Sequence, residues 1–310
     1  MMSLFIDWDV SPEIFSIGGF GIRYYSLFFA LAFVFGYKIE ERMFKAEGVP
    51  GPWLDKLWIY VAVATLAGAR LGHCLFYEWS YFSAHPLEIV LPVRFQPEFK
   101  FTGFQGLASH GAAIGIIAGL WYYSRKVSKK SILWVLDRAV IPIALAGCFI
   151  RLGNLMNSEI VGSPTDMEWG FRFLKGKGIE DPGLPRHPAQ LYEAFCYMVS
   201  FFILRRMFWK FKMQKMQGFI FCSFLILIFA ARFIIEYFKE VQETFELKMI
   251  AAYGINMGQL LSLPFILTGG FMLWFSYAKW KRRELLRPSN SRMSGRRPEA
   301  RRLGLTGGYI

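Results

Sequence analysis

The chain has 310 residues, of which 54% are apolar and only 19% charged, and it contains 32 Phe and 10 Trp. This composition indicates a membrane protein and argues against a soluble globular domain. The net charge of +13 comes mainly from basic loops and a basic tail, so no nucleic-acid partner is expected. The four cysteines lack C-x-x-C spacing and predict neither a disulfide framework nor a metal site; they are expected to be small buried side chains.

Seven stretches are long enough to cross a bilayer, since a spanning helix needs roughly 17–25 residues. They lie near 20–38, 55–77, 103–124, 132–150, 189–208, 217–238 and 258–278. No basic segment precedes the first stretch and no small-residue cleavage site follows it, so no cleavable signal peptide is expected. The sequence therefore predicts an all-α integral membrane protein with seven transmembrane helices.

The charges of the loops predict the orientation. Every second loop is basic and contains Lys38, Arg42 and Lys45; Arg125, Lys126, Lys129 and Lys130; or Lys210, Lys212 and Lys215. The intervening loop 78–102 contains only Arg94 and Lys100 as basic residues. Because cytoplasmic loops carry an excess of Lys and Arg, we expect the amino terminus outside, on the periplasmic side, and the carboxyl terminus in the cytoplasm.

The last 30 residues differ in composition from the rest of the chain. Nine basic residues against two glutamates give residues 281–310 a net charge of +7, and Pro, Ser and Gly are frequent there. We therefore predict a membrane domain over residues 1–280 and a disordered, basic cytoplasmic tail over 281–310. The tail is expected to be attracted to anionic lipid headgroups.

A polar stretch follows the apolar run from Ile132 to Ile150. It contains the candidate binding residues Arg151, Asn154, Asn157, Glu159 and Gly162. Ionisable groups at membrane depth cost roughly 2.5–3.5 kcal/mol for Arg or Asp unless they are paired or occupied by a ligand. A lone arginine would fit an interfacial loop with a snorkelling side chain. So many polar and glycine positions together favour a site for a charged molecule at lipid level.

Further polar residues fall at the same end of their predicted helices. They are, in chain order, Tyr25, Arg70, His110, His187, Gln190, Tyr192, Glu193, Arg232, Glu236 and Gln259. Chance would scatter such residues over both ends of the helices. Their common position predicts a polar chamber that opens toward the outer leaflet.

His110 starts a predicted helix in which Gly111, Gly115 and Gly119 repeat every four residues. This spacing allows neighbouring helix backbones to approach closely. His110 itself can serve as a base, an acid or a hydrogen-bond donor to an anion. A structural histidine with satisfied hydrogen bonds is the alternative, and the sequence leaves both open.

Arg232 and Glu236 are spaced i,i+4, which predicts an ion pair on one helix face. Such an ion pair would also orient the Arg232 guanidinium so that it can bind a phosphate. Arg151 and Arg232 together offer two guanidinium groups, the side chain suited to bidentate phosphate contacts.

The motif Arg151-Leu-Gly-Asn154-x-x-Asn157-x-Glu159-x-x-Gly162 closely resembles the signature of bacterial prolipoprotein diacylglyceryl transferases. Other landmarks of that family occur in the expected order: Ile22-Arg23-Tyr24-Tyr25, Gly68-Ala-Arg70-Leu-Gly72, His110-Gly111, Arg186-His187-Pro188-x-Gln190-Leu191-Tyr192-Glu193, Arg232-Phe-Ile-Ile-Glu236 and Gly258-Gln259-x-x-Ser262-x-Pro264. The chain departs from the family pattern at Ser26, Ala112 and Ile150, where glycines are usual. These departures concern the shape of the pocket and remove no charged group.

The resemblance implies transfer of the sn-1,2-diacylglyceryl group from phosphatidylglycerol to the lipobox cysteine of a prolipoprotein signal peptide. A thioether forms and glycerol phosphate leaves. The resemblance also implies a multi-pass enzyme of the bacterial cytoplasmic (inner) membrane that contacts membrane lipids, needs no cofactor or metal, and works as a monomer. The substrate supplies the nucleophilic thiol, whose pKa is about 8.5 and which attacks well only as thiolate.

The resemblance further suggests roles for individual residues. Arg151 and Arg232 would bind the phosphate, with Tyr25 and Asn154 as hydrogen-bond donors. His110 would accept the thiol proton, and Glu236 would orient Arg232. The remaining candidates in the lipid site are Asn157, Glu159 and Gly162, and the supporting residues are Arg70, His187, Gln190, Tyr192, Glu193 and Gln259.

Other classes of protein remain as alternatives. A small-anion transporter would be expected to show a site near the bilayer midplane and an internal repeat, and the sequence shows neither. An inactive lipid-binding relative would fit the lost glycines. An intramembrane serine protease has weak support, because Ser109 precedes His110 but no G-x-S-x-G motif occurs.

Overall fold

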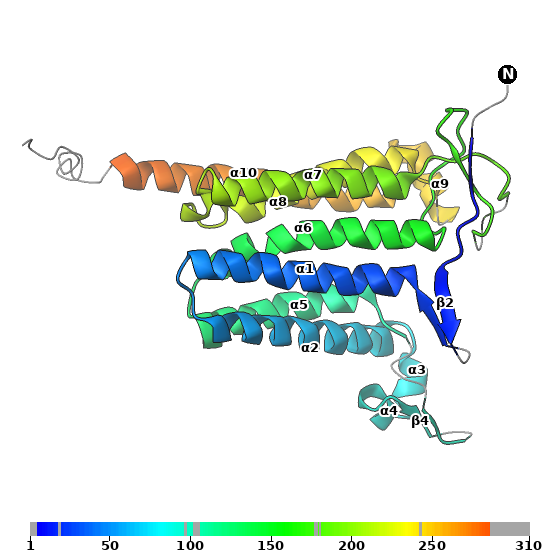
Figure 1. Cartoon of the computed structure of the whole chain (residues 1–310), viewed down its shortest axis with the longest axis horizontal. Coiled ribbons are helices and arrows are strands. Elements are labelled where there is room, and N and C mark those ends of the chain that lie inside the picture. The colour runs from blue at the N-terminus through cyan, green and yellow to red at the C-terminus, as the bar shows by residue number, and fades with distance from the viewer. Residues whose placement is uncertain are drawn as a thin grey trace, which may run out of the picture.

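The computed structural model describes residues 5–17, 20–95, 98–101, 106–176, 179, 181–241 and 244–285. Long helices lie side by side along the longest axis of the molecule, and short strands and helices gather at one end (Figure 1). The long helices are α1 (Tyr24–Ala46), α2 (Gly51–Phe76), α5 (Ser109–Tyr123), α6 (Ile132–Met156), α7 (Ala189–Trp209), α8 (Phe219–Ile235) and α10 (Met257–Leu285). Each of these helices overlaps one of the seven predicted stretches. The prediction of a mainly helical fold is therefore confirmed.

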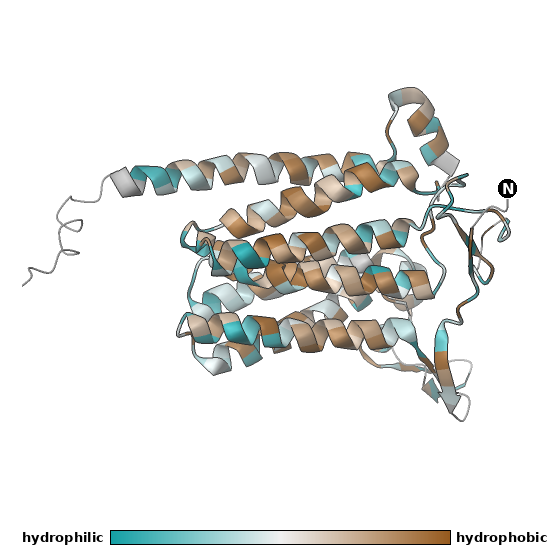
Figure 2. Cartoon of the chain, turned by 45° about the horizontal axis from the view of Figure 1, so that its top comes forward, coloured by the Kyte–Doolittle hydropathy of each residue, from teal (hydrophilic) through white to brown (hydrophobic). Residues whose placement is uncertain are grey.

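Four of the described helical segments are long and apolar enough to cross a membrane. They are Gly51–Phe76, Ile132–Met156, Phe219–Phe238 and Met257–Arg282. Apolar residues predominate along the middle of the bundle in Figure 2. The other three predicted stretches also contain helices, but α5 has only 15 residues, and α1 and α7 carry several charges. The number of seven spans and the orientation therefore stay predictions.

The helices pack in a simple order across the bundle. In Figure 1, α2 lies beside α5, α1 beside α6, and α7, α8 and α10 form the opposite side. One apolar core joins α6, α7 and α8 through fully buried Ile141, Leu204 and Ile220. Burying apolar side chains between helices also keeps backbone hydrogen bonds inside each helix, which a lipid environment requires.

Side-chain caps define where two of these helices begin. Ser131 accepts a hydrogen bond from the backbone N–H of Trp134 (3.2 Å) and thereby caps α6. Asp137 on α6 accepts from the backbone N–H groups of Gly218 (2.7 Å) and Phe221 (2.9 Å), where α8 begins. Gly218 has φ +86°, a left-handed conformation that favours glycine. The α6 carboxylate thus fixes the start of α8.

Glycines bring α2 and α5 into close contact. A Cβ on Gly72 would lie 2.7 Å from the Cα of Gly111, and a Cβ on Gly115 would lie 3.0 Å from the Cα of Gly68. No larger residue fits there without separating the two helices. The predicted packing role of Gly111 and Gly115 is confirmed.

The structure also contains strands that the all-α prediction lacked. β1 (Ile6–Trp8) pairs in parallel with β6 (Phe171–Phe173), and β2 (Glu13–Ile17) pairs antiparallel with β3 (Phe20–Arg23). A third ribbon joins β4 (Val93–Arg94) and β5 (Lys100–Phe101), and the short helices are α3 (Trp79–Phe82), α4 (Leu87–Val90) and α9 (Thr244–Tyr253). These elements are too short to show a hydrophobic period. The first predicted helix was therefore wrong over 20–23, which is a strand.

Three helices extend well past their predicted ends. α1 continues to Ala46, so Lys38, Arg42 and Lys45 lie on the helix and not in a loop after it. α6 continues to Met156, so Arg151 and Asn154 lie on the helix and not in a loop after it. α10 continues to Leu285, beyond the predicted domain boundary at residue 280. The rest of the predicted tail, 286–310, lies outside the described residues.

Candidate functional site

The predicted site residues lie at one end of the bundle. This is the end in Figure 1 where α1, α5, α7 and α10 begin and where α2, α6 and α8 end. The prediction that the polar residues share one end of the molecule is confirmed. Only some of these residues are in direct contact with one another.

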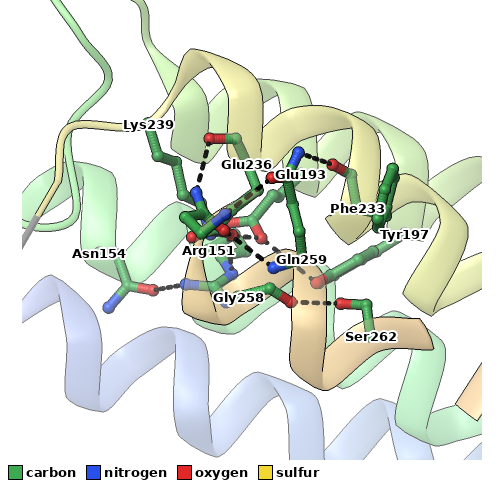
Figure 3. Close-up of polar contacts among 11 residues, drawn as sticks. Arg151, Asn154, Glu193, Tyr197, Phe233, Glu236, Lys239, Gly258, Gln259 and Ser262 are labelled. Carbon is green, nitrogen blue, oxygen red and sulfur yellow. Dashed lines mark hydrogen bonds and ion pairs between the residues drawn. The ribbon is translucent and has the colours of Figure 1, made fainter. Parts of the chain in front are cut away.

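Arg151, near the end of α6, lies against the first turns of α7. Its Nε is 2.9 Å from Oε2 of Glu193, and its Nη1 donates to Oδ1 of Asn154 at 3.3 Å. The Glu193 side chain is fully buried, whereas that of Arg151 is 15% exposed. Figure 3 shows both side chains directed into the same cluster. Glu193 and Asn154 thus hold the Arg151 guanidinium in place.

Lys239 is a second cation in this cluster, and the sequence analysis did not select it. Its Nζ lies 3.1 Å from Oε1 of Glu193 and 3.1 Å from Oε2 of Glu236 (Figure 3). Its side chain is only 7% exposed. Arg151, Glu193, Lys239 and Glu236 form an ion-pair network in which cations and carboxylates alternate. Such alternation is required because an unpaired buried charge is strongly destabilising.

The predicted ion pair between Arg232 and Glu236 was wrong. Glu236 contacts Lys239 instead, which the 3-10 turn over residues 236–238 brings beside it. The backbone N–H of Glu236 still donates to the Arg232 oxygen as in a helix, so the i,i+4 spacing is kept without an ion pair between the two side chains.

Arg232 is half-buried and makes no hydrogen bond or ion pair within the part of the chain that the structure describes. Arg232 lies near the end of α8 and Arg151 near the end of α6, and both helices end at the same end of the bundle. The ion-pair network is balanced in charge, with two cations and two carboxylates. Arg232 is thus a cation outside that network and has no ion-pair partner among the described residues.

Glu159 organises the chain just after α6. Its Oε1 accepts hydrogen bonds from Nδ2 of Asn154 (2.7 Å) and Nδ2 of Asn157 (3.2 Å). The backbone carbonyl of Glu159 accepts from Nε2 of fully buried Gln190 (2.8 Å). The signature motif is thus internally bonded, and Asn154 connects it to Arg151.

Gly162 lies where three segments of the chain meet. A Cβ there would clash with the backbone oxygen of His187 and lie 2.6 Å from that of Phe238. The Gly162 N–H also donates to the His187 oxygen (2.9 Å). The predicted binding residue Gly162 therefore has a structural reason to be glycine.

His187 and Tyr192 pack beside this junction. Nδ1 of His187 lies 3.1 Å from the Tyr192 hydroxyl, which also accepts from Nε1 of Trp169 (2.9 Å). The His187 ring stands edge-on to Phe238, with 5.2 Å between centroids. Burial lowers the pKa of His187 because it disfavours the charged ring, so His187 is neutral at neutral pH.

Gln259 and Gly258 position Glu236 from α10. The Gln259 side chain accepts from the backbone N–H of Asn256 (3.0 Å) and donates to the Phe233 oxygen (3.3 Å). A Cβ on Gly258 would lie 2.5 Å from Oε1 of Glu236, so only glycine leaves room for that carboxylate. Gln259 thus connects α8 to the start of α10. Among the described residues it makes no hydrogen bond to Arg151 or Arg232.

The remaining predicted residues lie apart from the ion-pair network. The Tyr25 ring packs on Gly153 of α6, where a Cβ would lie 2.7 Å from it. Arg70 is buried and donates to the backbone oxygens of Glu88 (2.6 Å) and Ile89 (3.2 Å), so it supports the loop that contains α4. His110 is exposed and makes no hydrogen bond in the described part of the chain.

Among the described residues, no three His, Cys, Asp or Glu side chains form a group that could hold a metal ion. The four cysteines are unpaired; Cys74, Cys148 and Cys222 are buried as predicted, whereas Cys196 is half-buried.

Two features define the class of this protein. Its apolar helices are those of a helical membrane protein, and at one end they carry a balanced ion-pair network with an additional free guanidinium. It is therefore a helical membrane protein with a buried ion-pair network at one end of the bundle.

Comparison with known proteins gives the family. Residues 12–275 match the family model described as prolipoprotein diacylglyceryl transferase, and the chain belongs to this family. A relative from Porphyromonas gingivalis, named phosphatidylglycerol–prolipoprotein diacylglyceryl transferase, is 45% identical over 87% of this chain and 94% of its own length. Proteins of the same name from Tolumonas auensis and Bacteroides fragilis are 44% and 41% identical, over 89% and 90% of this chain and 99% and 97% of theirs.

Proposed function

We propose that this protein transfers the diacylglyceryl group of phosphatidylglycerol to the lipobox cysteine of a prolipoprotein signal peptide. Membership of the family and the names of its relatives support this activity. The observation that carries the proposal in this chain is the half-buried Arg232, which has no ion pair among the described residues and lies at the same end of the bundle as the tethered Arg151. Together they present two guanidinium groups where an anionic lipid headgroup would be bound.

The two arginines have different parts in this proposal. Arg151 is held by Glu193 and Asn154, so its guanidinium is already oriented before a lipid arrives. Arg232 has no contact to give up and can turn toward the phosphate. Preorganised donors of this kind stabilise charge that develops in the transition state. Here the developing charge is on the departing glycerol phosphate.

The chemical step is a substitution at the glyceryl carbon. The substrate thiolate forms a C–S bond while the C–O bond to phosphate breaks, and the electron pair leaves with glycerol phosphate. The thiol proton goes to a base, for which His110 stays our candidate because histidine titrates near neutrality. Its exposed position at the start of α5, at the same end as the arginines, supports this role.

The finer architecture belongs to the same proposal. We propose seven spans, with the site facing the outer leaflet of the bacterial inner membrane and a polar chamber between the helix ends. Residues 1–280 would form the catalytic membrane domain, and 281–310 a basic cytoplasmic tail. The protein would act as a monomer on lipid and signal peptide, without nucleic acid.

The test uses purified protein in detergent micelles with phosphatidylglycerol and a lipobox peptide. Glycerol phosphate release is followed beside the mass increase of the peptide. Arg232→Ala is the most informative variant, because no contact within the described residues is lost with it. We expect turnover to fall by about 10²–10³-fold, as on removal of one oxyanion donor. Exposed Arg94→Ala is the matched control and should retain turnover.

Two further variants separate the roles. Arg151→Ala should nearly abolish turnover, while His110→Gln should lower it by about 10²–10⁴-fold and leave measurable activity. Near-normal turnover in both arginine variants would rule out the phosphate site. A loss of only a few-fold in His110→Gln would remove His110 from the base role.

A further inference from the structure

An elongated apolar cavity of about 310 Å³ lies between α1, α2, α5 and α6. Its lining is almost wholly apolar, with Glu40 as the one ionisable side chain. Phe29 and Ile150 line the end toward the candidate site, and Glu40 and Ala139 line the opposite end. Ile150 immediately precedes Arg151 on α6, so this end of the cavity reaches the level of the candidate site along the helix, while the Arg151 side chain itself turns toward Glu193 on α7.

The helices that line the cavity give its length. The lining residues of α1 run from Phe29 to Glu40, and those of α6 from Ala139 to Ile150. Each set spans 11 residues (40 − 29 and 150 − 139), which at a rise of 1.5 Å per residue corresponds to about 16 Å. The C–C bond length and tetrahedral angle give a saturated chain about 1.3 Å per carbon, so about 12 or 13 methylenes fit.

Glu40 is an unusual residue to find at the end of such a cavity. It is only 2% exposed, and its Oε2 accepts a hydrogen bond from Nε1 of Trp58 (3.0 Å). Its Oε1 is buried without a hydrogen-bond partner among the described residues. Buried polar atoms are nearly always paired, and ionisable residues among apolar helices commonly have a function.

We propose that this cavity holds one acyl chain of the donor phospholipid and that Glu40, held by Trp58, forms a polar floor that limits the chain length. The inference rests on the proposed function and names a specificity-determining residue for it. The apolar lining, the length, and the end of the cavity at the level of Arg151 along α6 all fit an acyl chain whose headgroup is bound at the arginines.

We expect Glu40 to limit the length of the bound acyl chain and not to change the affinity for acyl chains in general. Lipid tails are as apolar as the cavity, so a chain gains little simply by moving from bilayer to protein. A chain that is too long must either bend or press its methyl end against the Glu40 carboxyl. The second option places a methyl group against a carboxyl oxygen that has no hydrogen-bond partner in the described part of the chain, an unfavourable contact for a polar group.

The test compares donor lipids with saturated chains of about 12 and about 18 carbons, which bracket the estimated length. Ala146→Phe fills the cavity between its two ends, and Glu40→Leu removes the polar floor. Exposed Ala67→Phe on α2 and Glu41→Leu, which removes the partner of Lys45, are the matched controls. If Ala146→Phe fails to fold, Ala32→Leu reduces the cavity from the facing wall.

We expect Ala146→Phe to lower the ratio of kcat/KM for long over short donors by about tenfold, the discrimination that a pocket achieves against one or two methylenes. Glu40→Leu should raise the same ratio, and neither control should change it. Unchanged ratios in both cavity variants, with transfer intact, would overturn the inference.

A second readout does not depend on catalysis. Lipids that copurify with each variant are identified by mass spectrometry, and Ala146→Phe should retain fewer long chains than wild type and Ala67→Phe. If wild type transferred nothing from any donor, the proposed function would fail. The copurified chain lengths would then still decide whether the cavity holds an acyl chain, and an unchanged distribution in Ala146→Phe would overturn that inference.

Discussion

Lys239 joins carboxylates from two helices, and this contact gives a prediction about stability. Lys239→Met keeps the length of the side chain but leaves buried Glu193 and nearly buried Glu236 with one cation fewer. Removing one partner of a buried ion pair typically costs about 3–5 kcal/mol. We therefore expect Lys239→Met to unfold at a clearly lower temperature than wild type in detergent. Thermal unfolding followed by tryptophan fluorescence measures this.

The controls for Lys239 separate charge from length. Lys239→Arg restores the cation and should recover most of the lost stability. Lys248→Met removes a lysine from an exposed position and should unfold as wild type does. Equal unfolding temperatures for Lys239→Met and Lys248→Met would mean that the network does not stabilise the fold.

At the residue scale, sequence motifs predicted the members of the site better than their partners. Arg151, Asn154 and Glu159 were selected by residue type and spacing, and direct contacts join them. The partner of Glu236 was mispredicted because the 3-10 turn after α8 brings Lys239 beside its carboxylate. Lys239 follows Glu236 at i,i+3, so a search for such spacings would have found that pair. Its contact with Glu193 depends on the packing of α7 beside α8, which no local pattern encodes.

At the scale of elements, the contact between α2 and α5 depends on small residues along both helices. A Cβ on Gly115 would clash with the backbone oxygen of Ala64 and lie 3.0 Å from the Cα of Gly68. Gly115→Ala should therefore force the helices apart and cost about 1–3 kcal/mol, as overpacking typically does. The measurement is thermal unfolding in detergent.

Gly270→Ala is the matched control for Gly115→Ala, because no atom lies within 4 Å of a Cβ built on Gly270. Alanine is a better helix former than glycine, by about 1 kcal/mol, so this control should be neutral or slightly stabilising. If both alanine variants behaved alike, close packing of α2 on α5 would not be limiting for stability.

The elements differ in how far a sequence predicts them. Helices such as α7 (predicted 189–208, found Ala189–Trp209) are long apolar stretches with clear ends. β1 and β6 are three residues each and pair across more than 160 positions of the chain. Their pairing depends on how the surrounding segments fold over the helix ends, so no local pattern predicts it. The early end predicted for α6 reflects a different limit, because polar residues can continue a helix where their partners lie on a neighbouring one.

At the scale of the whole molecule, the end that carries the ion-pair network is opposite the end that carries the basic loop before α6 (Figure 1). Asp166 and Lys126 are exposed residues at these two ends. The positive-inside rule places Lys126 in the cytoplasm and Asp166 outside. The site would then face the leaflet from which a secreted signal peptide can be reached, which the proposed reaction requires.

Cysteine labelling tests this orientation. In cells with a permeabilised outer membrane, a membrane-impermeant maleimide should label Asp166→Cys at once but Lys126→Cys only after the inner membrane is disrupted. Three of the native cysteines are buried and the fourth is half-buried, so wild type should give a low background. The reverse order would place the ion-pair network in the cytoplasm, where a transferase acting on exported lipoproteins could not meet its substrate, and would contradict the orientation and the function together.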